Sequence, residues 1–185
     1  MTILPQGTET WTGTTAGDNV SVYGNNGPVT LNGMGGDDIL QGGFSNDTLN
    51  GGAGNDALYG NGGFDILSGG DGDDFLAGGS GGGVLHGGLG ADTFYFRGSD
   101  NAANNQPHDF VMDFETGVDV LQFQYGDPTI EEVHTIEMAY GLRAHAINWS
   151  SQDGDGVISL WTYGDLSADD FSGAAFAAGV FDGIA

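Results

Sequence analysis

The sequence of 185 residues has no cysteine, and only two of its residues are basic, Arg97 and Arg143. Without cysteine, disulfides, thiol catalysis and cysteine-ligated zinc are excluded. The 26 acidic residues give a formal net charge of −24, which argues against nucleic acid and anionic membranes as partners, because both are bound through Lys and Arg patches. No apolar run approaches membrane-spanning length, and residues 1–11 lack the basic and apolar regions of a Sec-type signal peptide. We therefore expect no nucleic-acid partner and no membrane insertion.

Glycine, by contrast, is abundant, with 37 residues, and much of it falls in a nine-residue repeat. In the nine windows that start at Thr15, position 1 is Gly in eight, position 4 is Gly in seven and position 6 is Asp in six. Position 8 is apolar in all nine windows, from Val22 to Phe94, although only 38% of the chain is hydrophobic. The position-6 carboxylates are Asp38, Asp47, Asp56, Asp65, Asp74 and Asp92, and the exceptions are Val20, Val29 and Gly83.

Each window predicts a turn followed by a short strand. Residues rich in Gly, Asn and Asp favour a turn, since glycine adopts φ > 0 without a steric penalty. The last three residues of a window predict a strand whose position-8 side chain points inward. Strands this short must stack. The chain is therefore predicted to wind into two parallel sheets, with 18 residues per coil and an apolar core between the sheets.

Stacking brings the acidic positions into rows. Asp38, Asp56, Asp74 and Asp92 are predicted along one edge of the coil, and Asp47 and Asp65 along the other. Two carboxylates about 5 Å apart repel by roughly 3 kcal/mol at an effective dielectric constant near 20, so a cation between successive turns would stabilise the coil. Carboxylates and the carbonyls of glycine turns are hard oxygens with loose geometry, which favour Ca²⁺ over Zn²⁺ or Mg²⁺.

The segments GGAGNDALY (51–59) and GGDGDDFLA (69–77) resemble the GGxGxDxUx nonapeptide of repeats-in-toxin (RTX) proteins, the haemolysin-type calcium-binding family. The resemblance implies an all-β, right-handed parallel β-roll (a β-solenoid). In that family Ca²⁺ lies between turns, held by the Asp and by alternating carbonyls of the glycine turn.

Carried onto this sequence, the resemblance implies sites with two carboxylates at Asp38/Asp56, Asp47/Asp65, Asp56/Asp74 and Asp74/Asp92, hence about four Ca²⁺ ions within a range of about three to six. The glycines that it places at these ions are Gly33, Gly35, Gly51, Gly52, Gly54, Gly69, Gly70, Gly72, Gly88 and Gly90. A site between Asp65 and Gly83, or above Asp38 at Val20, would have one carboxylate and is expected to be weak or empty.

After Phe96 the repeat stops. Residues 108–126 predict a hairpin and resemble the segment that follows the repeats in RTX proteins, where Asp113 and Asp119 could bind one more ion. Apolar spacing predicts a helix over 127–140, and residues 144–164 predict two strands joined at 153–156. Ser167 and the acids after it predict a short helix over 166–181. We therefore expect a β-rich C-terminal cap with one or two short helices, which covers the strand edges of the roll.

The expected organisation is an N-terminal lead-in at 1–14, a calcium-binding β-roll at 15–96 and a C-terminal capping region at 97–185. In RTX proteins such a C-terminal region also carries an uncleaved type I secretion signal. The resemblance therefore implies that the chain is secreted to the cell exterior, with a type I secretion apparatus as a partner.

Two functions stay open. The chain has no H-E-x-x-H motif, no G-x-S-x-G motif and scattered histidines, so we expect no enzymatic activity. One function is a secreted calcium-binding module that folds in extracellular Ca²⁺ and supports type I export, either free-standing or as the tail of a larger enzyme. The other is a carbohydrate-binding accessory module of a secreted polysaccharide-modifying enzyme. A polyanionic glycan would need a basic stripe, and a neutral glycan would need exposed aromatics, for which Tyr23, Tyr59 and Tyr95 are the candidates.

Overall fold

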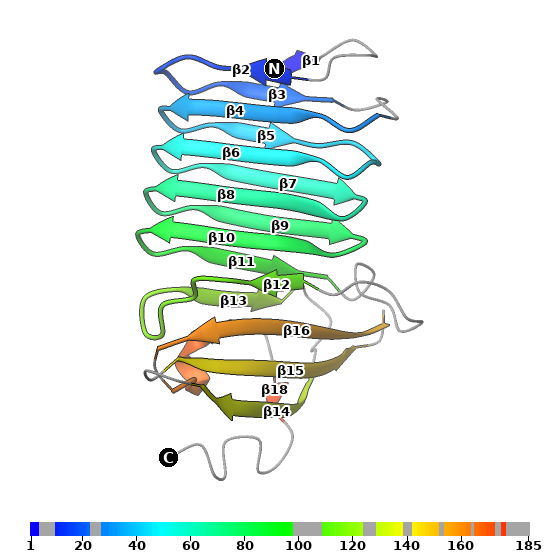
Figure 1. Ribbon diagram of the computed structural model, residues 1–185, viewed down its shortest axis with the longest axis vertical. Helices are drawn as coiled ribbons and strands as arrows, with labels where there is room; N and C mark the ends of the chain where they lie inside the picture. Colours follow the sequence, from blue (N-terminus) through cyan, green and yellow to red (C-terminus); the bar gives the residue numbers. More distant parts are fainter. Residues whose placement is uncertain are drawn as a thin grey trace.

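The computed structural model describes residues 1–3, 10–22, 27–97, 109–123, 129–138, 142–151, 154–163, 165–172 and 175–176. Its strands form two sheets, and along the repeats the chain passes from one sheet to the other and back (Figure 1). The eight-stranded sheet has the order β1 (Thr2–Ile3), β3 (Asn19–Ser21), β5 (Ile39–Gln41), β7 (Ala57–Gly62), β9 (Phe75–Ser80), β11 (Thr93–Phe96), β13 (Val120–Phe123) and β17 (Phe171–Ser172). The ten-stranded sheet has the order β18 (Ala175–Phe176), β14 (Thr129–Glu137), β15 (Arg143–Ser151), β16 (Gly154–Thr162), β12 (Asp109–Val111), β10 (Gly83–Leu89), β8 (Asp65–Asp71), β6 (Thr48–Ala53), β4 (Thr30–Gly35) and β2 (Thr10–Thr12).

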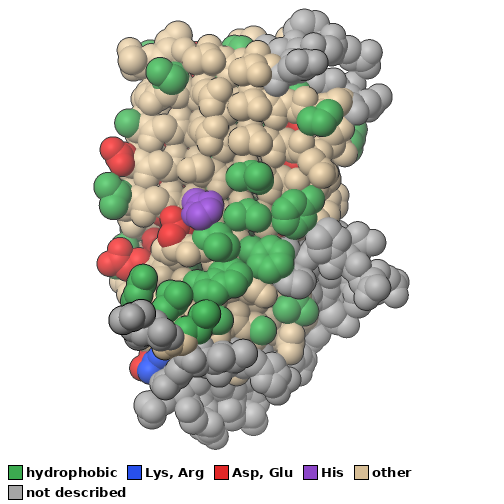
Figure 2. Space-filling model, in the orientation of Figure 1, with side chains coloured by type: hydrophobic (Ala, Val, Ile, Leu, Met, Phe, Trp, Pro, Cys, Tyr) green, Lys and Arg blue, Asp and Glu red, His purple; other side chains and the backbone are tan. Residues whose placement is uncertain are grey.

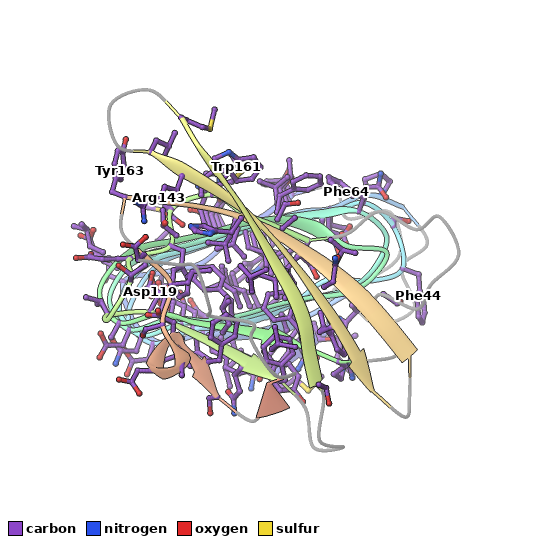
Figure 3. The ribbon with its side chains drawn as sticks, turned by 90° about the horizontal axis from the view of Figure 1, so that it is seen from below. Phe44, Phe64, Asp119, Arg143, Trp161 and Tyr163 are labelled. Atoms are coloured by element: carbon purple, nitrogen blue, oxygen red, sulfur yellow. The ribbon has the colours of Figure 1, made fainter. Side chains whose placement is uncertain are left out.

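Within the repeats, parallel pairing recurs every 18 residues. The position-8 residues of the ten-stranded sheet pair in the order Leu31, Leu49, Leu67 and Leu85. Those of the eight-stranded sheet pair in the order Leu40, Leu58, Leu76 and Phe94, and Leu121 continues the row. Each of these side chains has an exposed fraction of 0%, and burying one leucine stabilises a fold by about 2 kcal/mol. Seen along the axis, the coil is a flattened ring with side chains packed between its sheets (Figure 3). The predicted parallel β-roll is confirmed.

The first coil differs from the predicted frame. Val20, not Val22, pairs with Leu40, although both valines are fully buried. Two extra residues lie between β3 and β4, so Asp18 takes the place in register with Asp38. The prediction that Val20 stands above Asp38 is therefore wrong. The frame failed because a turn tolerates inserted residues, whereas the strand register does not.

Residues 108–126 do not form the predicted hairpin. β12 pairs in parallel with β10 in the ten-stranded sheet, and β13 pairs in parallel with β11 in the eight-stranded sheet. These strands therefore continue the coil. The open edges of the roll supply parallel partners for both strands, and this tertiary pairing outweighs the local hairpin pattern.

The helix predicted over 127–140 is wrong as well, because β14 occupies Thr129–Glu137 and pairs antiparallel with β15. Its β-branched residues, among them Ile130 and Val133, suit a strand better than a helix. β15 and β16 form the two predicted strands and pair antiparallel, but the predicted junction at 153–156 is wrong, because β16 begins at Gly154 and residues 154–156 pair with β15.

Of the helix predicted over 166–181, the structure contains a 3₁₀ turn at Ala168–Asp170. The predicted cap is present, since the Ser167 hydroxyl accepts the Asp169 N–H. The strands β17 and β18 follow this turn, and residues 177–185 lie outside the described part of the chain.

One residue of the roll sits in a backbone conformation that disfavours it. Met34 has a φ of 82° at the position that Gly52 occupies in the next coil. Its side chain is 57% exposed, so removing it sacrifices little packing. We expect Met34→Gly to stabilise the folded protein by about 1 kcal/mol, because a β-carbon in the left-handed region costs about 1–2 kcal/mol and glycine's extra chain entropy offsets only part of that gain. Urea or thermal unfolding measures the shift. Met34→Ala keeps the β-carbon, and an equal gain in that variant would contradict the explanation.

Candidate metal centre

Two rows of carboxylates run along the narrow edges of the coil. We define the first row as Asp18, Asp38, Asp56, Asp74, Asp92 and Asp119, and the second row as Asp47 and Asp65. Figure 3 shows the two edges, with Asp119 at one and Phe44, from a turn of the second row, at the other. The six predicted position-6 carboxylates are all at most 2% exposed. Buried charges of this kind require a partner of opposite charge.

One oxygen of each carboxylate is fixed by the neighbouring coil. The Asp38 N–H donates to Oδ1 of Asp56 at 2.7 Å, and the Asp56 N–H donates to Oδ1 of Asp74 at 2.7 Å. The same bond joins Asp18 to Asp38, Asp74 to Asp92, and Asp92 to Asp119, at 2.6–2.9 Å. In the second row the Asp47 N–H donates to Oδ1 of Asp65 at 2.7 Å. These bonds hold the accepting carboxylates in one orientation, and the Val29 N–H does the same for Asp47 by donating to its Oδ1 at 2.9 Å.

In five of these carboxylates the other oxygen is left for a ligand, whereas Oδ2 of Asp47 accepts the Gly43 N–H at 2.7 Å. Oδ2 of Asp38, Asp56, Asp65, Asp74 and Asp92 is buried and has no hydrogen-bond partner among the described residues. Each of these oxygens lies against the first glycine of its own repeat. At Gly51, for example, an added β-carbon would collide with Oδ2 of Asp56 and with the carbonyl oxygen of Gly69 in the next coil. The absent side chain of the glycine therefore leaves the space in which a carboxylate and a carbonyl oxygen meet.

The same arrangement recurs at the other position-1 glycines. Gly33 and Gly69 were predicted at the ions, and they bring Oδ2 of Asp38 and Asp74 next to the carbonyls of Gly51 and Gly87. Sequence reasoning did not single out Gly42, Gly60, Gly78 and Gly87, although the nine-residue frame contains them. Gly60 places Oδ2 of Asp65 beside the Gly78 carbonyl on the second row.

The remaining predicted glycines shape the turns. Gly52, Gly54, Gly70, Gly72, Gly88 and Gly90 all have φ between 110° and 133°, and an added β-carbon at each would meet a carbonyl of the preceding coil. Gly35 does not belong to this set, because Gly36, with a φ of 87°, occupies the equivalent of Gly54. Such turns let successive backbones stack closely.

Three further carboxylates lie at the two ends of the first row, Asp18 at the start and Asp113 and Asp119 beyond Asp92. Asp18, which sequence reasoning missed, has Oδ2 close to Gly13 and to the Gly33 carbonyl, but this oxygen accepts the Thr14 N–H at 2.9 Å. Asp119 accepts N–H bonds from Asp92 and Glu115, and Asp113 accepts them from Gly87 and Gly88. The structure therefore brings Asp113 and Asp119 close to Asp92, with all four oxygens bonded to backbone amides.

Burial raises the pKa of the six position-6 carboxylates. The pKa reaches about 7 at Asp65 and Asp74 and about 6 at Asp56 and Asp92, with neighbouring carboxylates adding to the shift. The backbone N–H that each accepts acts in the opposite direction. The chain has two basic residues, and one of them, Arg143, pairs with Asp165. Side chains therefore cannot supply the countercharge for these rows.

These oxygens fit a calcium ion. Among the described residues no group of three His, Cys, Asp or Glu side chains converges on one point, so an ion on the rows would draw on backbone carbonyls as well as carboxylates. Mixed carboxylate and carbonyl oxygen is the ligand chemistry of Ca²⁺. The buried Oδ2 atoms and the spaces left by the position-1 glycines therefore suit a calcium ion.

Comparison with known families agrees with this chemistry. The model of the RTX calcium-binding nonapeptide repeat, which spans four copies, matches overlapping segments at 14–49, 23–58, 32–67, 50–85 and 68–101. Residues 14–101 belong to the RTX calcium-binding repeat family. RTX nonapeptide repeats bind calcium, and in this chain the matched segment contains both rows from Asp18 to Asp92.

Other comparisons add less. No curated protein sequence matches the chain. Among solved structures, the chain is similar to the solution structure of the AlgE6R3 subunit from the Azotobacter vinelandii mannuronan C5-epimerase, with 22% identity over 86% of this chain and 80% of that one. The TM-score of 0.39 is too low for that likeness to support a conclusion about function. No helix among the described residues is long and apolar enough to cross a membrane.

The position of a carboxylate within the first row sets its expected importance. Asp56 has carboxylate neighbours with unpartnered Oδ2 atoms on both sides, whereas Asp92 has one. We expect Asp56→Asn to raise the calcium midpoint of folding more than Asp92→Asn, because it weakens two ion sites instead of one. Asparagine keeps the oxygen that accepts the backbone N–H, so the pair isolates the lost charge. Calcium titration followed by circular dichroism measures both midpoints, and equal shifts would contradict the stacked register.

Acid should partly replace calcium in holding the roll together. The pKa of Asp56 and Asp92 lies at about 6, and that of Asp65 and Asp74 at about 7, in the folded protein, against about 3.9 for Asp in an unfolded chain. Between these values the folded state binds more protons, so its stability without calcium rises as the pH falls from 7.5 to 5. We expect more β-structure at pH 5 than at pH 7.5 in calcium-free buffer, by circular dichroism. Calcium-saturated protein is the control, with no such gain. A decrease on acidification would show that burial does not penalise these charges.

Proposed function

We propose that this chain is a secreted calcium-binding β-roll module whose folding is driven by extracellular Ca²⁺ and which supports type I export. The single observation that carries the proposal is the set of buried, unpartnered Oδ2 atoms along both rows. A chain with 26 acidic and two basic residues needs an external cation to bury such a set.

The proposed ions lie between successive carboxylates of each row. Pairs with two carboxylates are Asp38/Asp56, Asp56/Asp74 and Asp74/Asp92 in the first row and Asp47/Asp65 in the second. We therefore propose about four Ca²⁺ ions, within a range of about three to six. The upper end of the range would need Asp18, or Asp113 with Asp119, whose oxygens accept backbone N–H bonds as those of Asp47 also do.

Calcium binding would then act as the folding switch. Without a cation the rows repel, and 37 glycines raise the backbone entropy that folding must overcome. With calcium, binding free energy becomes folding free energy, because the ligands converge only in the coil. Extracellular oxygen-ligand modules bind Ca²⁺ at about 10⁻⁴–10⁻³ M, so a low-calcium cell interior would keep the roll unfolded.

An unfolded state inside the cell suits passage through a narrow export channel. In this proposal the region 97–185 caps the roll and also carries the signal read by a type I apparatus, as its resemblance to RTX C-termini implies. The proposed segments are a lead-in at 1–14, a calcium-binding roll at 15–96 and a cap with the export signal at 97–185. The two sheets nevertheless continue across the boundary after residue 96, since β12 and β13 extend them.

We do not propose the glycan-binding function or catalysis. Tyr59 and Tyr95, two of the candidate glycan contacts, pack against Phe75 in tilted ring contacts, with ring-centroid distances of 5.6 and 5.4 Å. Their ring faces are thus partly used within the sheet. Tyr23 lies outside the described residues. The buried carboxylates serve calcium better than acid–base chemistry, because the contact between a carboxylate oxygen and a position-1 glycine recurs from coil to coil.

The test is removal and return of calcium. We expect chelated protein to give the circular dichroism spectrum of a disordered chain, and a cooperative gain of β-structure near millimolar calcium. Magnesium should be a poor substitute, because it demands an octahedral geometry that these turns do not offer. Isothermal titration calorimetry gives the stoichiometry. If chelated protein keeps its full β-signal and thermal transition, the leucine core suffices alone and the switch is wrong.

A further inference from the structure

The second row has a gap in the repeats that the fold closes from elsewhere. The frame predicts a carboxylate after Asp47 and Asp65, but Gly83 stands there, paired with Asp65 on the neighbouring strand. An ion between Asp65 and the next coil would therefore have one carboxylate if it depended on the repeats. The position-1 glycine of that window, Gly78, is nevertheless present.

Asp109, the first residue of β12, fills this position. β12 pairs in parallel with β10 through Val84↔Phe110 and Leu85↔Val111, so Asp109 follows Gly83 in the register of the sheet. Its side chain is 2% exposed. An added β-carbon on Gly78 would collide with Oδ1 of Asp109, as an added β-carbon on Gly60 would collide with Oδ2 of Asp65. Asp109 thus reaches back one coil to the place where a repeat carboxylate would lie.

Oxygen atoms therefore alternate along the second row as they do along the first. Oδ2 of Asp65 is fully buried and has no hydrogen-bond partner among the described residues. The Gly78 carbonyl oxygen and Oδ2 of Asp65 both lie in the space where a side chain of Gly60 would be. Oδ1 of Asp109 lies in the corresponding space at Gly78. We propose that Asp65, the Gly78 carbonyl and Asp109 hold one divalent cation with hard-oxygen preference, Ca²⁺, which ties the post-repeat chain to the roll. This inference rests on the proposed calcium-binding function and extends it beyond the repeats.

The position of β12 gives that ion a structural role. In the ten-stranded sheet β12 lies between β10, the last repeat strand, and β16 of the antiparallel β14–β15–β16 unit. Phe110 of β12 stacks on Trp161 of β16 with ring centroids 6.2 Å apart, and Phe64 of the roll lies 6.5 Å from Phe110. Figure 3 shows Phe64 and Trp161 on the same face, and Figure 2 shows hydrophobic side chains gathered over the lower part of the described surface. An ion at Asp109 would fix the one strand through which the unit joins this sheet of the roll.

The experiment counts ions on the full chain with native mass spectrometry at saturating calcium. We expect Asp109→Asn to bind one Ca²⁺ fewer than the wild type, and Asp65→Asn to bind at least one fewer. Asp73→Asn is the matched control. Asp73 is exposed, and asparagine keeps the oxygen that accepts the Ala91 N–H at 2.8 Å, so the control loses a charge near the ions and should bind the wild-type number.

Hydrogen exchange gives a second readout on the same proteins. In the wild type, calcium should protect amides of β12 and β16 as well as those of β4, β6 and β8. Asp109→Asn should reduce the calcium-dependent protection of β12 and β16 at least tenfold and leave that of β4 and β6 unchanged.

The possible outcomes separate this inference from the proposed function. A wild type that binds no calcium would overturn both. A wild type that binds calcium, with Asp109→Asn matching it in ion number and protection, would overturn the Asp109 site and leave the calcium-binding roll intact. Loss of every ion in Asp109→Asn would also overturn it, because the proposed ion belongs to the junction and not to the first row.

Discussion

The burial of like charges in rows is the constraint on which the rest of the structure depends. Parallel strands lie about 4.8 Å apart, so a carboxylate repeated at the same place in every coil must have another directly beside it. In this protein those carboxylates are also removed from water, with Asp65 fully buried and Asp74 2% exposed. Two basic residues in the whole chain cannot compensate for them. The glycine content, the charge and the proposed dependence on calcium all follow from this geometry.

The core and the edges have separate tasks. The leucines between the sheets supply nonspecific stabilisation, and any coil of the right period would bury them. The edges specify the register, because five carboxylates each accept an N–H from the coil before and turn the second oxygen towards a carbonyl of the coil after. These are Asp38, Asp47, Asp56, Asp65 and Asp74. A slip of one residue would retain the apolar content of the core strands only in part and would break every one of these contacts. Position-1 glycines are needed because any side chain would occupy the space where those oxygens meet.

Much of this could be predicted from the sequence, and the failures have physical causes. The nine-residue period identifies the two sheets, the buried position 8 and the rows of Asp38 and Asp47, because each depends on contacts at a fixed spacing. The nine-residue frame did not predict Asp18 as a member of the row, because a turn accommodates two inserted residues without disturbing the strands. The frame did not predict Asp109 either, because its position depends on which strand edge β12 pairs with, and no local sequence pattern encodes that pairing. The segment 127–140 was misread because helical spacing and β-branched composition disagree there, and pairing with β15 decides between them.

At the end of the roll, both the open strand edges and the rows of buried carboxylates must be terminated. A solenoid needs a terminal element that satisfies its last strand edges. Here the chain first adds β12 and β13 as a further layer on both sheets, and only then turns to the antiparallel strands β14, β15 and β16. The added layer carries carboxylates of its own, Asp109 on the second edge and Asp119 on the first, in register with the rows. The layer therefore continues the charge pattern of the repeats after their sequence has ended. Asp119 differs from the repeat carboxylates in having both oxygens satisfied by backbone amides, so it can end the first row without an ion beyond it. With the proposed cations at its interior steps, the row can end in this way without leaving an unpaired buried oxygen.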